Sequence, residues 1–278
     1  MTEEKISLLT QLAVQAGEEI LKVYAEPFDV EKKSDGSPVT VADAAAEKVI
    51  LAGLAQVFPE IPVVAEESVE AGILPVVEGR YFLVDPLDGT KEFLKRNGEF
   101  TVNIALIEDG NPVFGVVSAP ALGEIFWGGS IAANQHKSAF KGRIETGKIV
   151  DVEPISVRTP PQSGLSVLAS RSHMSEETAS LISRLGVAEK LSVGSSLKLC
   201  WLAAGQADFY PRMAPTMQWD IAAGDAVLRA AGGALVYAET GKDFTYQVPT
   251  QAIKDDLLNP HFLAVGCRSV LADLALSD

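Results

Sequence analysis

The first 25 residues carry apolar side chains at intervals of three and four positions, which is the period of one helical face. These positions are Ile6, Leu9, Leu12, Ala16, Ile20 and Val23. The pattern predicts an amphipathic helix over residues 3–25 that ends before Pro27. A second helix should begin after Thr40 and run to about Val57, because Thr40 and Asp43 have the spacing of a capping box.

The apolar run at residues 81–84 has the length and composition of a buried strand. Because Pro86 cannot extend a sheet ladder, this strand should stop at Asp85. Asp85 and Asp88 would then lie at the carboxyl end of a strand, where open α/β sheets place their ligands. The Gly-Thr pair that follows should turn into a helix, whose first amide groups can bind an anion.

Further apolar runs, separated by turn residues, predict more strands and helices. The other strands are predicted at residues 61–65, 100–107, 112–118, 124–127, 165–169, 191–193, 208–210, 234–237 and 262–266, and the other helices at 176–185, 194–204, 219–228 and 268–276. The strands between residues 100 and 127 should form an antiparallel meander. Residues 69–80 are predicted to be a flexible connection and 128–153 a loop-rich bridge whose lysines lie on the surface. This mixture predicts an α/β protein.

The net charge narrows the classes of partner. The chain has 37 acidic residues against 23 lysines and arginines, a net charge of −14, and no basic cluster that could follow a phosphate backbone. Polymeric nucleic acid is therefore not expected as a partner. A small phosphorylated molecule is still compatible with this charge, because metal ions or a few local cations can reverse the field inside a cleft.

Length, cysteine content and hydropathy indicate the general class of protein. At 278 residues and 47% hydrophobic content, the chain can bury a large core, as one domain or as two lobes. Cys200 and Cys267 lack the spacing of a zinc site and are predicted to be reduced and buried. The sequence has no signal-peptide pattern and no apolar run of membrane-spanning length, so we expect a soluble cytoplasmic protein, with peripheral membrane association left open.

Four groups of acids fall at predicted strand ends or helix starts: Asp43, Glu66 with Glu67, Asp85 with Asp88, and Asp220. Each group also has an ordinary structural explanation. Asp43 and Asp220 fit helix caps, and Glu67 fits a solvated loop. Asp85 and Asp88 fit either a capped turn or a metal-assisted phosphate site, so only the combination of all four groups distinguishes these readings.

In this combination and order, the sequence resembles the metal-dependent, lithium-sensitive phosphatase superfamily that includes inositol monophosphatases and fructose bisphosphatases. The pattern is Asp, then Glu-Glu, then Asp-Pro-Leu-Asp-Gly-Thr, then Trp-Asp-x-Ala-Ala, and it spans residues 40–230. Within that superfamily, several segments are similar to the bacterial 3′(2′),5′-bisphosphate nucleotidase branch. They are Asp-Gly-Thr-Lys-Glu-Phe at 88–93, the strand at 100–107, Ala-Ser-Arg-Ser-His at 169–173, Gly-Ser-Ser-Leu-Lys at 194–198 and Tyr-Pro-Arg at 210–212.

The resemblance implies a fold and an activity. The fold would be an alternating αβαβα sandwich with an α+β lobe at 1–153, which carries most metal ligands, and an α/β lobe at 154–278, which carries Asp220 and the selectivity residues. The activity would be hydrolysis of adenosine 3′,5′-bisphosphate (PAP) to AMP and phosphate, with the phosphosulfate PAPS as a further substrate to consider. The cofactor would be Mg²⁺, with two or three ions in the site.

The resemblance also implies residue roles. The Mg²⁺ ligands would be Glu66, Asp85, the Leu87 carbonyl, Asp88 and Asp220, with Glu67 supporting them. The catalytic residues would be Asp43, Thr90 and Glu66, with Asp43 and Thr90 orienting the attacking water. The amides of Gly89 and Thr90 would hold the phosphate. Mg²⁺ prefers such oxygen ligands, and two metal ions can activate water without a nucleophilic side chain.

Selectivity for a nucleotide with two phosphates needs cations beyond the metals. The candidates for ribose and phosphate contacts are Arg171, His173, Gly194, Ser195, Ser196, Lys198, Arg212 and Asp220. Taken alone, Arg212 also fits an ordinary surface residue and His173 a structural one. The segment 128–153 departs from the plainer glycine pattern of the superfamily, so base or sugar preference would differ if it walls the pocket.

Two alternative functions remain for this sequence. An inositol or sugar phosphatase of the same superfamily would share the metal site, and Lys91-Glu92 with the segment 169–173 favours the nucleotidase instead. A metal-binding scaffold that has lost catalysis should have a broken acid set, whereas here every acid of the pattern is present. The sequence leaves the oligomeric state open between monomer and homodimer.

Overall fold

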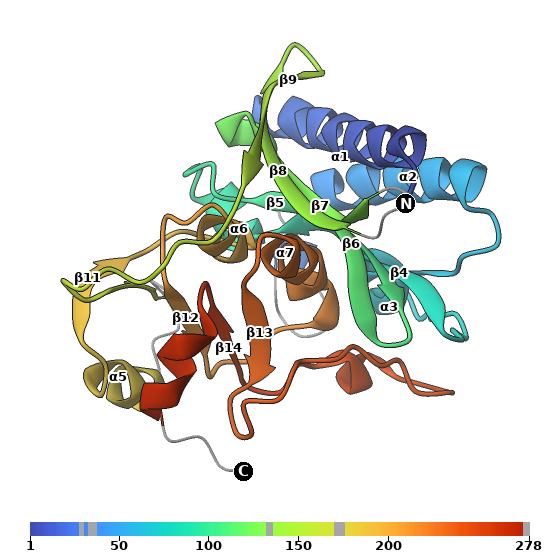
Figure 1. Ribbon diagram of the computed structural model, residues 1–278. Coiled ribbons are helices and arrows are strands. Elements are labelled where there is room, and N and C mark those ends of the chain that lie inside the picture. The colour runs from blue at the N-terminus through green and yellow to red at the C-terminus, as the bar shows by residue number, and fades with distance from the viewer. Residues whose placement is uncertain (28–30, 33–37, 132–135, 170–175, 275–278) are drawn as a thin grey trace.

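Figure 1 shows the computed structural model, which describes residues 1–27, 31–32, 38–131, 136–169 and 176–274. Helices and two β-sheets alternate in the αβαβα order that the resemblance implied. No helix within these ranges is both long and apolar enough to span a membrane.

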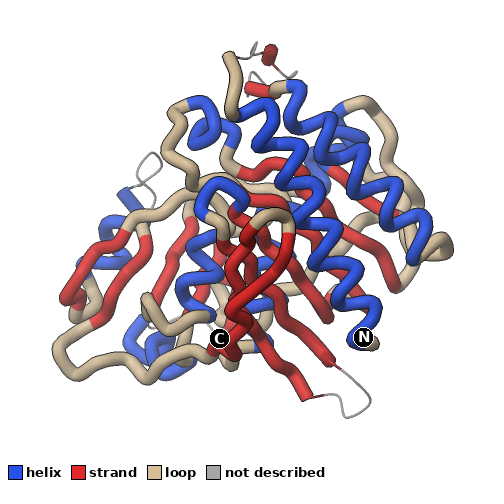
Figure 2. Tube along the Cα trace, turned by 90° about the horizontal axis from the view of Figure 1, so that it is seen from above, coloured by secondary structure: helices blue, strands red, loops and turns tan. Residues whose placement is uncertain are grey.

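Two long helices, α1 (Glu3–Tyr24) and α2 (Val41–Val57), form one outer layer and lie side by side (Figure 2). The side chain of Thr2 caps α1, and Thr40 caps α2 in a capping box with Asp43. The apolar faces of both helices pack on one face of the larger sheet. Both helices are therefore confirmed, because their caps and their apolar period are local signals.

The larger sheet has seven strands built from the apolar runs of the first half of the chain. In sheet order, they are β3 (Val63–Ala65), β4 (Arg80–Asp88), β5 (Thr101–Glu108), β6 (Asn111–Ala119), β7 (Glu124–Ile131), β8 (His136–Glu145) and β9 (Lys148–Ile155). β3 runs parallel to β4, and all other neighbours are antiparallel. The predicted meander is confirmed in β5, β6 and β7.

The smaller sheet has five strands from the second half of the chain. In sheet order, they are β11 (Val187–Leu191), β10 (Leu165–Leu168), β12 (Phe209–Arg212), β14 (Phe262–Val265) and β13 (Ala234–Tyr237). β10 is parallel to both of its neighbours, whereas β14 is antiparallel to β12 and β13. Helix α5 (Glu176–Ser183) and the 3₁₀ helix η3 (Arg268–Leu274) pack on its outer face.

Helices α6 (Leu197–Ala203) and α7 (Gln218–Ala230) fill the layer between the two sheets (Figure 1). Small residues let α7 approach the larger sheet closely, because a Cβ atom placed on Gly115 of β6 would lie only 2.3 Å from the carbonyl oxygen of Ala223. The small residues of the helix allow this close packing. It also brings α7 into contact with β4.

A buried ion pair anchors the second half of α7. Asp225 is fully buried and accepts hydrogen bonds from Arg229 Nε at 2.8 Å and from the Tyr246 hydroxyl at 2.9 Å. Arg229 also donates to the carbonyl oxygen of Phe244 at 2.7 Å. Because both charges have several partners, this pair can stay buried, and it connects the helix to the segment that follows β13.

The short elements complete the chain. They are β1 (Glu31–Lys32) paired with β2 (Pro38–Val39), α3 (Glu66–Glu70), α4 (Thr90–Leu94) and the 3₁₀ helices η1 (Pro120–Leu122) and η2 (Lys254–Leu257). The predicted closing helix exists as η3, and its described part is 3₁₀.

The prediction of a loop-rich bridge at 128–153 is wrong. β7 extends to Ile131, and β8 and β9 form an antiparallel hairpin at the sheet edge farthest from β3, while residues 132–135 lie outside the described part. The sequence pattern did not predict this hairpin because the side chains of β9 are mostly exposed, and an exposed strand has no apolar run. Lys141 is also less exposed than predicted, since its ammonium group pairs with Glu124 at 2.5 Å.

The two cysteines differ in environment. Cys200 is fully buried in α6, as predicted, and burial raises the pKa of its thiol. Cys267 was also predicted to be buried, but it is partly exposed just after β14 and lies 3.1 Å from the hydroxyl of Ser269, which lowers its pKa. The apolar strand before Cys267 suggested burial, but the strand ends at Val265, two residues before the cysteine.

Candidate metal and phosphate site

Strand β4 delivers two acids to one place. The strand continues to Asp88 instead of stopping at Asp85 as predicted. Asp85 pairs with Asn103 of β5 and Asp88 pairs with Thr101, so β4 contains one extra residue between the two acids. Pro86, which has no N–H to donate, lies in this bulge. The extra residue shifts the alternation of side chains, so that two acids three positions apart face the same side.

Asp220 joins the two acids from the first turn of α7. Its Oδ2 atom accepts a hydrogen bond from the Met217 amide at 2.8 Å, so Asp220 caps the helix as the simpler reading predicted. One carboxylate oxygen from each of Asp85, Asp88 and Asp220 nevertheless lies within 4.8 Å of the other two. Capping and clustering are therefore combined in one side chain.

Glu66 approaches the cluster from the first turn of α3. The sequence placed Glu66 and Glu67 in a loop, whereas they begin this short helix. Glu47 of α2 holds its start, accepting from the Glu67 amide at 2.9 Å and from the Ser68 hydroxyl at 2.6 Å. The side chain of Glu66 hydrogen-bonds to Asp85, and this bond contributes to the raised pKa of Asp85.

Burial is the main reason that the pKa of Asp85 lies well above its ordinary value, and the charges of Glu66, Asp88 and Asp220 raise it further. The pKa of Asp220 is raised by the same causes, against smaller lowering effects of the Met217 amide and of Arg212. The four acids therefore repel one another in a buried place. Protons or cations must relieve that repulsion.

These residues fit a hard divalent cation. The clustered side chains present only carboxylate oxygens, with no histidine or thiol among them, and that is the ligand chemistry of Mg²⁺ and related ions. Leu87 lies between the two acids of β4, and its amide donates to Asp85 Oδ1 at 2.9 Å. Mutual repulsion among buried carboxylates is what a bound cation would remove.

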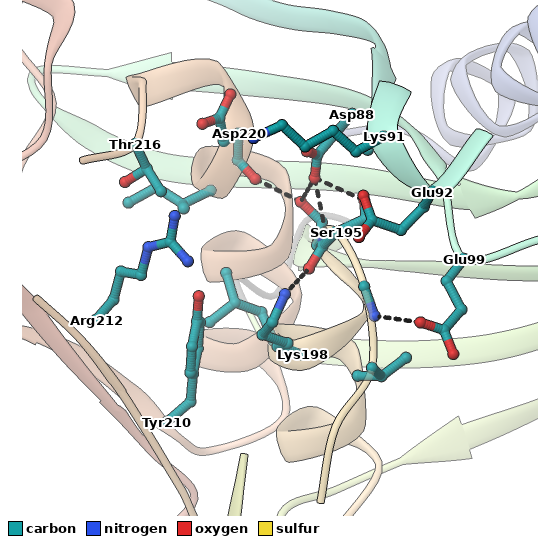
Figure 3. Close-up of a pocket in the computed structure, with 16 residues that line it drawn as sticks. Asp88, Lys91, Glu92, Glu99, Ser195, Lys198, Tyr210, Arg212, Thr216 and Asp220 are labelled. Carbon is teal, nitrogen blue, oxygen red and sulfur yellow. Dashed lines mark hydrogen bonds between the residues drawn. The ribbon is translucent and has the colours of Figure 1, made fainter. Parts of the chain in front are cut away.

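Asp88 is held from the opposite side by the turn that starts α6 (Figure 3). Its Oδ2 atom accepts hydrogen bonds from the Ser195 hydroxyl at 2.6 Å, the Ser196 amide at 2.8 Å and the Ser196 hydroxyl at 3.2 Å. The start of α6 thus holds an acid of the protein itself. Glu99 supports the turn by accepting from the Gly194 amide at 2.8 Å.

Lys198 and Arg212 lie near the acids and face the same pocket, which Lys91 also lines (Figure 3). Lys198 of α6 is 7% exposed, donates to the Ser195 carbonyl at 3.1 Å and lies 5.6 Å from the ring centre of Tyr210. Burial lowers the pKa of Lys198 to about 8, and Arg212 lowers it too, whereas Asp88, Glu92 and Glu99 act in the opposite direction. Carbonyl oxygens of Ala214 and Pro215 fix the guanidinium group of Arg212.

The pocket lined by these acids and cations has a volume of about 150 Å³. The predicted residues that line it are Asp88, Gly89, Gly194, Ser195, Ser196, Lys198, Arg212 and Asp220, and Lys91 and Glu92 line it as well. In Figure 3, Asp88 and Asp220 lie at one end with Lys91 beside them, and Lys198 and Arg212 lie at the other end, while Glu92 and Glu99 line the side. Such a pocket can hold one phosphate beside a metal ion and a second anionic group beside Lys198 and Arg212.

The remaining predicted residues lie around this centre. Asp43 is buried, and its Oδ2 atom accepts from the amide and hydroxyl of Thr40 at 2.8 and 2.9 Å, so the capping role is confirmed. Gly89, with a φ of 92°, precedes α4, and the Thr90 hydroxyl lies 3.5 Å from the Leu87 carbonyl. Arg171 and His173 lie outside the described residues.

Sequence reasoning missed four polar residues that hold the centre together: Glu47, Glu99, Thr101 and Asn103. Asn103 had a signal that could have identified it, because it is an amide within the apolar strand 100–107 and is fully buried. Glu47 had none, since its spacing on α2 fits an exposed helical face as well as a buried one.

In the metal-free protein, Asp85→Asn is expected to raise the free energy of unfolding at pH 7 by about 0.5–2 kcal/mol. The pKa of Asp85 is raised in the folded state. The stability that its proton contributes is therefore present at acid pH and lost as the pH rises through the raised pKa. Urea unfolding with a chelator across a pH series should show a difference between variant and unaltered protein that grows with pH.

A matched control for this measurement is Asp255→Asn, which removes the charge of an exposed acid. The difference in free energy of unfolding between this variant and the unaltered protein should stay nearly constant across the same pH series. A pH-independent difference for Asp85→Asn would contradict the interpretation that charge repulsion destabilises the metal-free cluster.

The layered fold and the converging carboxylates define an α/β protein whose central site suits a divalent cation and a phosphorylated molecule. The model of the inositol monophosphatase family matches residues 1–266, and the chain belongs to this family.

Individual relatives support a narrower comparison. The 3′(2′),5′-bisphosphate nucleotidase CysQ of Salmonella typhimurium is 45% identical over 91% of this chain and 96% of its own length. The protein of the same name from Escherichia coli K12 is 44% identical over the same shares of the two chains. The crystal structure of CysQ from Bacteroides thetaiotaomicron, at 35% identity, matches 95% of this chain and 97% of its own with a TM-score of 0.74. An IMPase from Thermotoga maritima, at 24% identity and a TM-score of 0.73, shares the fold.

Proposed function

We propose that the protein is a metal-dependent 3′(2′),5′-bisphosphate nucleotidase that hydrolyses the 3′-phosphate of PAP to give AMP and phosphate. The observation that carries this proposal is the pocket that Asp88 and Asp220 line at one end and Lys198 and Arg212 at the other (Figure 3). A substrate with two phosphates can place one phosphate at each end of this pocket. The nucleotidase name of relatives that are 44–45% identical supports the same activity.

Mg²⁺ would be held by Glu66, Asp85, Asp88, Asp220 and the Leu87 carbonyl, with Glu67 and Glu47 supporting Glu66 from behind. When bound, such a metal lowers the pKa of a water molecule and neutralises charge on phosphoryl oxygens. The raised pKa values of Asp85 and Asp220 support this assignment, because they reflect burial and repulsion among carboxylates, which a bound cation would relieve.

The protein's own residues would position the reactants. Asp43 and the Thr90 hydroxyl orient the attacking water, and the amides of Gly89 and Thr90 bind the phosphate to be removed. The left-handed conformation of Gly89, at a φ of 92°, turns the chain from β4 into α4 and supports this role. The attack displaces the ribose 3′-oxygen, which leaves with a proton from solvent or from a neighbouring acid.

The second phosphate would bind at the cationic end of the pocket. Lys198 contributes a buried positive charge, and the guanidinium group of Arg212 can donate to phosphate oxygens in pairs. PAPS, which carries a phosphosulfate at the same place, would fit by the same charges. In the proposed division of labour, the lobe at 1–153 supplies most metal ligands, and the lobe at 154–278 supplies Asp220 and both cations.

An inositol or sugar phosphatase is the second candidate function, because the acidic end of the pocket suits any phosphate monoester. The end of the pocket lined by Lys198 and Arg212 distinguishes the two candidate functions. A neutral polyol offers no second charge to Lys198 and Arg212, which would then remain in the pocket without an anionic partner from the substrate.

The test is release of phosphate from PAP and from inositol 1-phosphate, each with Mg²⁺ and with a chelator. We expect kcat/KM for PAP to exceed that for inositol 1-phosphate by about 100-fold, since a charged hydrogen bond contributes about 1.5–3 kcal/mol. Activity should disappear with the chelator. Equal or greater activity on inositol 1-phosphate would favour the second candidate, and activity that survives chelation would contradict the metal.

A further inference from the structure

A buried polar ladder joins β5 to the start of α6. Thr101 and Asn103 of β5 and Glu99, two residues before the strand, lie at every second position, and each contacts one of three consecutive residues of the turn before α6. Glu99 binds the Gly194 amide, the Thr101 hydroxyl lies 2.5 Å from that of Ser195, and Asn103 Nδ2 donates to Ser196 Oγ at 2.9 Å. Thr101 and Asn103 are fully buried between two largely apolar layers.

The hydroxyl of Ser196 lies at the centre of this ladder. It accepts from Asn103, contacts Oδ2 of Asp88 at 3.2 Å and makes a short contact with the backbone carbonyl of Asp220. A hydroxyl has one proton to donate. Because Asn103 donates to the oxygen, that proton must go toward Asp88 or Asp220. One side chain thus connects acids that come from different layers of the fold.

We propose that Ser196, oriented by Asn103, is a positioning residue that sets the place of Asp88 relative to Asp220, in support of the metal site. This inference rests on the proposed function. The Asp88 carboxylate cannot rotate without breaking its hydrogen bonds from the Ser195 hydroxyl and the Ser196 amide and losing its contact with the Ser196 hydroxyl. Residues that orient metal ligands in this way change metal affinity by about 10–100-fold when they are removed.

A contribution to the stability of the fold does not explain why this network is polar. A fully buried amide and hydroxyls between apolar layers must be completely paired to avoid a penalty, and apolar residues of the same shape would pack there without that requirement. The polar residues join β5 to the turn before α6, and this turn contacts Asp88 of β4 and Asp220 of α7. Their arrangement is explained by the need to hold two repelling carboxylates at a defined separation.

A direct substrate contact is the competing role for the Ser196 hydroxyl, and the two roles predict different measurements. A substrate contact would raise KM for PAP and leave metal affinity unchanged in the substrate-free protein. A positioning residue weakens metal binding before any substrate is present.

The experiment measures Mn²⁺ binding to the substrate-free, full-length protein by electron paramagnetic resonance, with thermal unfolding as a check on folding. Ser196→Ala and Asn103→Leu, the latter close to isosteric, are each expected to weaken Mn²⁺ binding about 10-fold or more. Because Asn103 acts through Ser196, the double variant should bind about as weakly as Ser196→Ala alone. The Mg²⁺ concentration for half-maximal phosphate release from PAP should rise in parallel.

Ser118→Ala is the matched control. Ser118 lies opposite Val102 on the neighbouring strand, and its hydroxyl is fully buried and makes no hydrogen bond to any described residue. Its removal should leave Mn²⁺ affinity unchanged. Unchanged affinity in Ser196→Ala would overturn the positioning role and leave the proposed function intact. Failure of the unaltered protein to bind Mn²⁺ would overturn both.

Discussion

Asp88→Asn is expected to lower the turnover of PAP by about 1,000-fold or more, while the fold stays intact. Oδ2 of Asp88 accepts three hydrogen bonds from the turn at Ser195 and Ser196. An asparagine can satisfy these donors only with its oxygen, so its NH₂ group would face the cluster and repel a cation. The measurement is phosphate release from PAP at saturating Mg²⁺, with circular dichroism and thermal unfolding to verify the fold.

Asp255→Asn is again the control, because it makes the same change in net charge at an exposed position. Its turnover should equal that of the unaltered protein. Near-normal turnover of Asp88→Asn would remove Asp88 from the metal ligands. Isothermal titration of Mg²⁺ into the variant separates loss of metal binding from loss of chemistry, and we expect the metal binding to be lost.

Lys198→Met is expected to lower kcat/KM for PAP by about 10–100-fold, mainly through KM, because it removes a charged contact to the second phosphate. Methionine keeps much of the length and the apolar stem of the lysine. For the substrate 3′-AMP, which has no 5′-phosphate, the variant's kcat/KM should fall far less. The ratio of kcat/KM for PAP to that for 3′-AMP should therefore fall in the variant.

The pH dependence provides a second readout for Lys198. Burial lowers its pKa to about 8, so the side chain is charged below that pH and neutral above it. Attraction for the second phosphate is thus present below pH 8, and kcat/KM for PAP should fall as the pH rises through that value. Lys198→Met should lack this alkaline decline. Lys190→Met, at an exposed position, should retain it.

An unchanged ratio of PAP to 3′-AMP in Lys198→Met would place the second phosphate elsewhere in the pocket. Arg212 is then the next candidate, since it lines the same pocket and its guanidinium is fixed by two carbonyl oxygens. The same substitution at Arg212 would distinguish the two cations, because only the one that binds the 5′-phosphate changes the ratio.

Local signals predicted much of the fold. Helices α1 and α2 followed from their caps and apolar period, and the meander from its apolar runs and turns. The hairpin of β8 and β9 was missed because an exposed edge strand has no apolar run. The end of β4 was placed too early because Pro86 normally stops a ladder, whereas here a bulge accommodates it. The start of α3 was missed because its cap, Glu47, comes from another helix.

The sequence by itself determined the chemistry of the site: four groups of acids with oxygen ligands, in an order that identified the family, and cations suited to a second phosphate. It could not determine which side chains would meet. Only the tertiary structure brought Asp85, Asp88 and Asp220 within 4.8 Å of one another and placed Lys198 and Arg212 in the same pocket as Asp88 and Asp220. The reason is physical, because these separations depend on a bulge, on close packing of α7 and on hydrogen bonds between layers. All of them join residues that are distant in the chain.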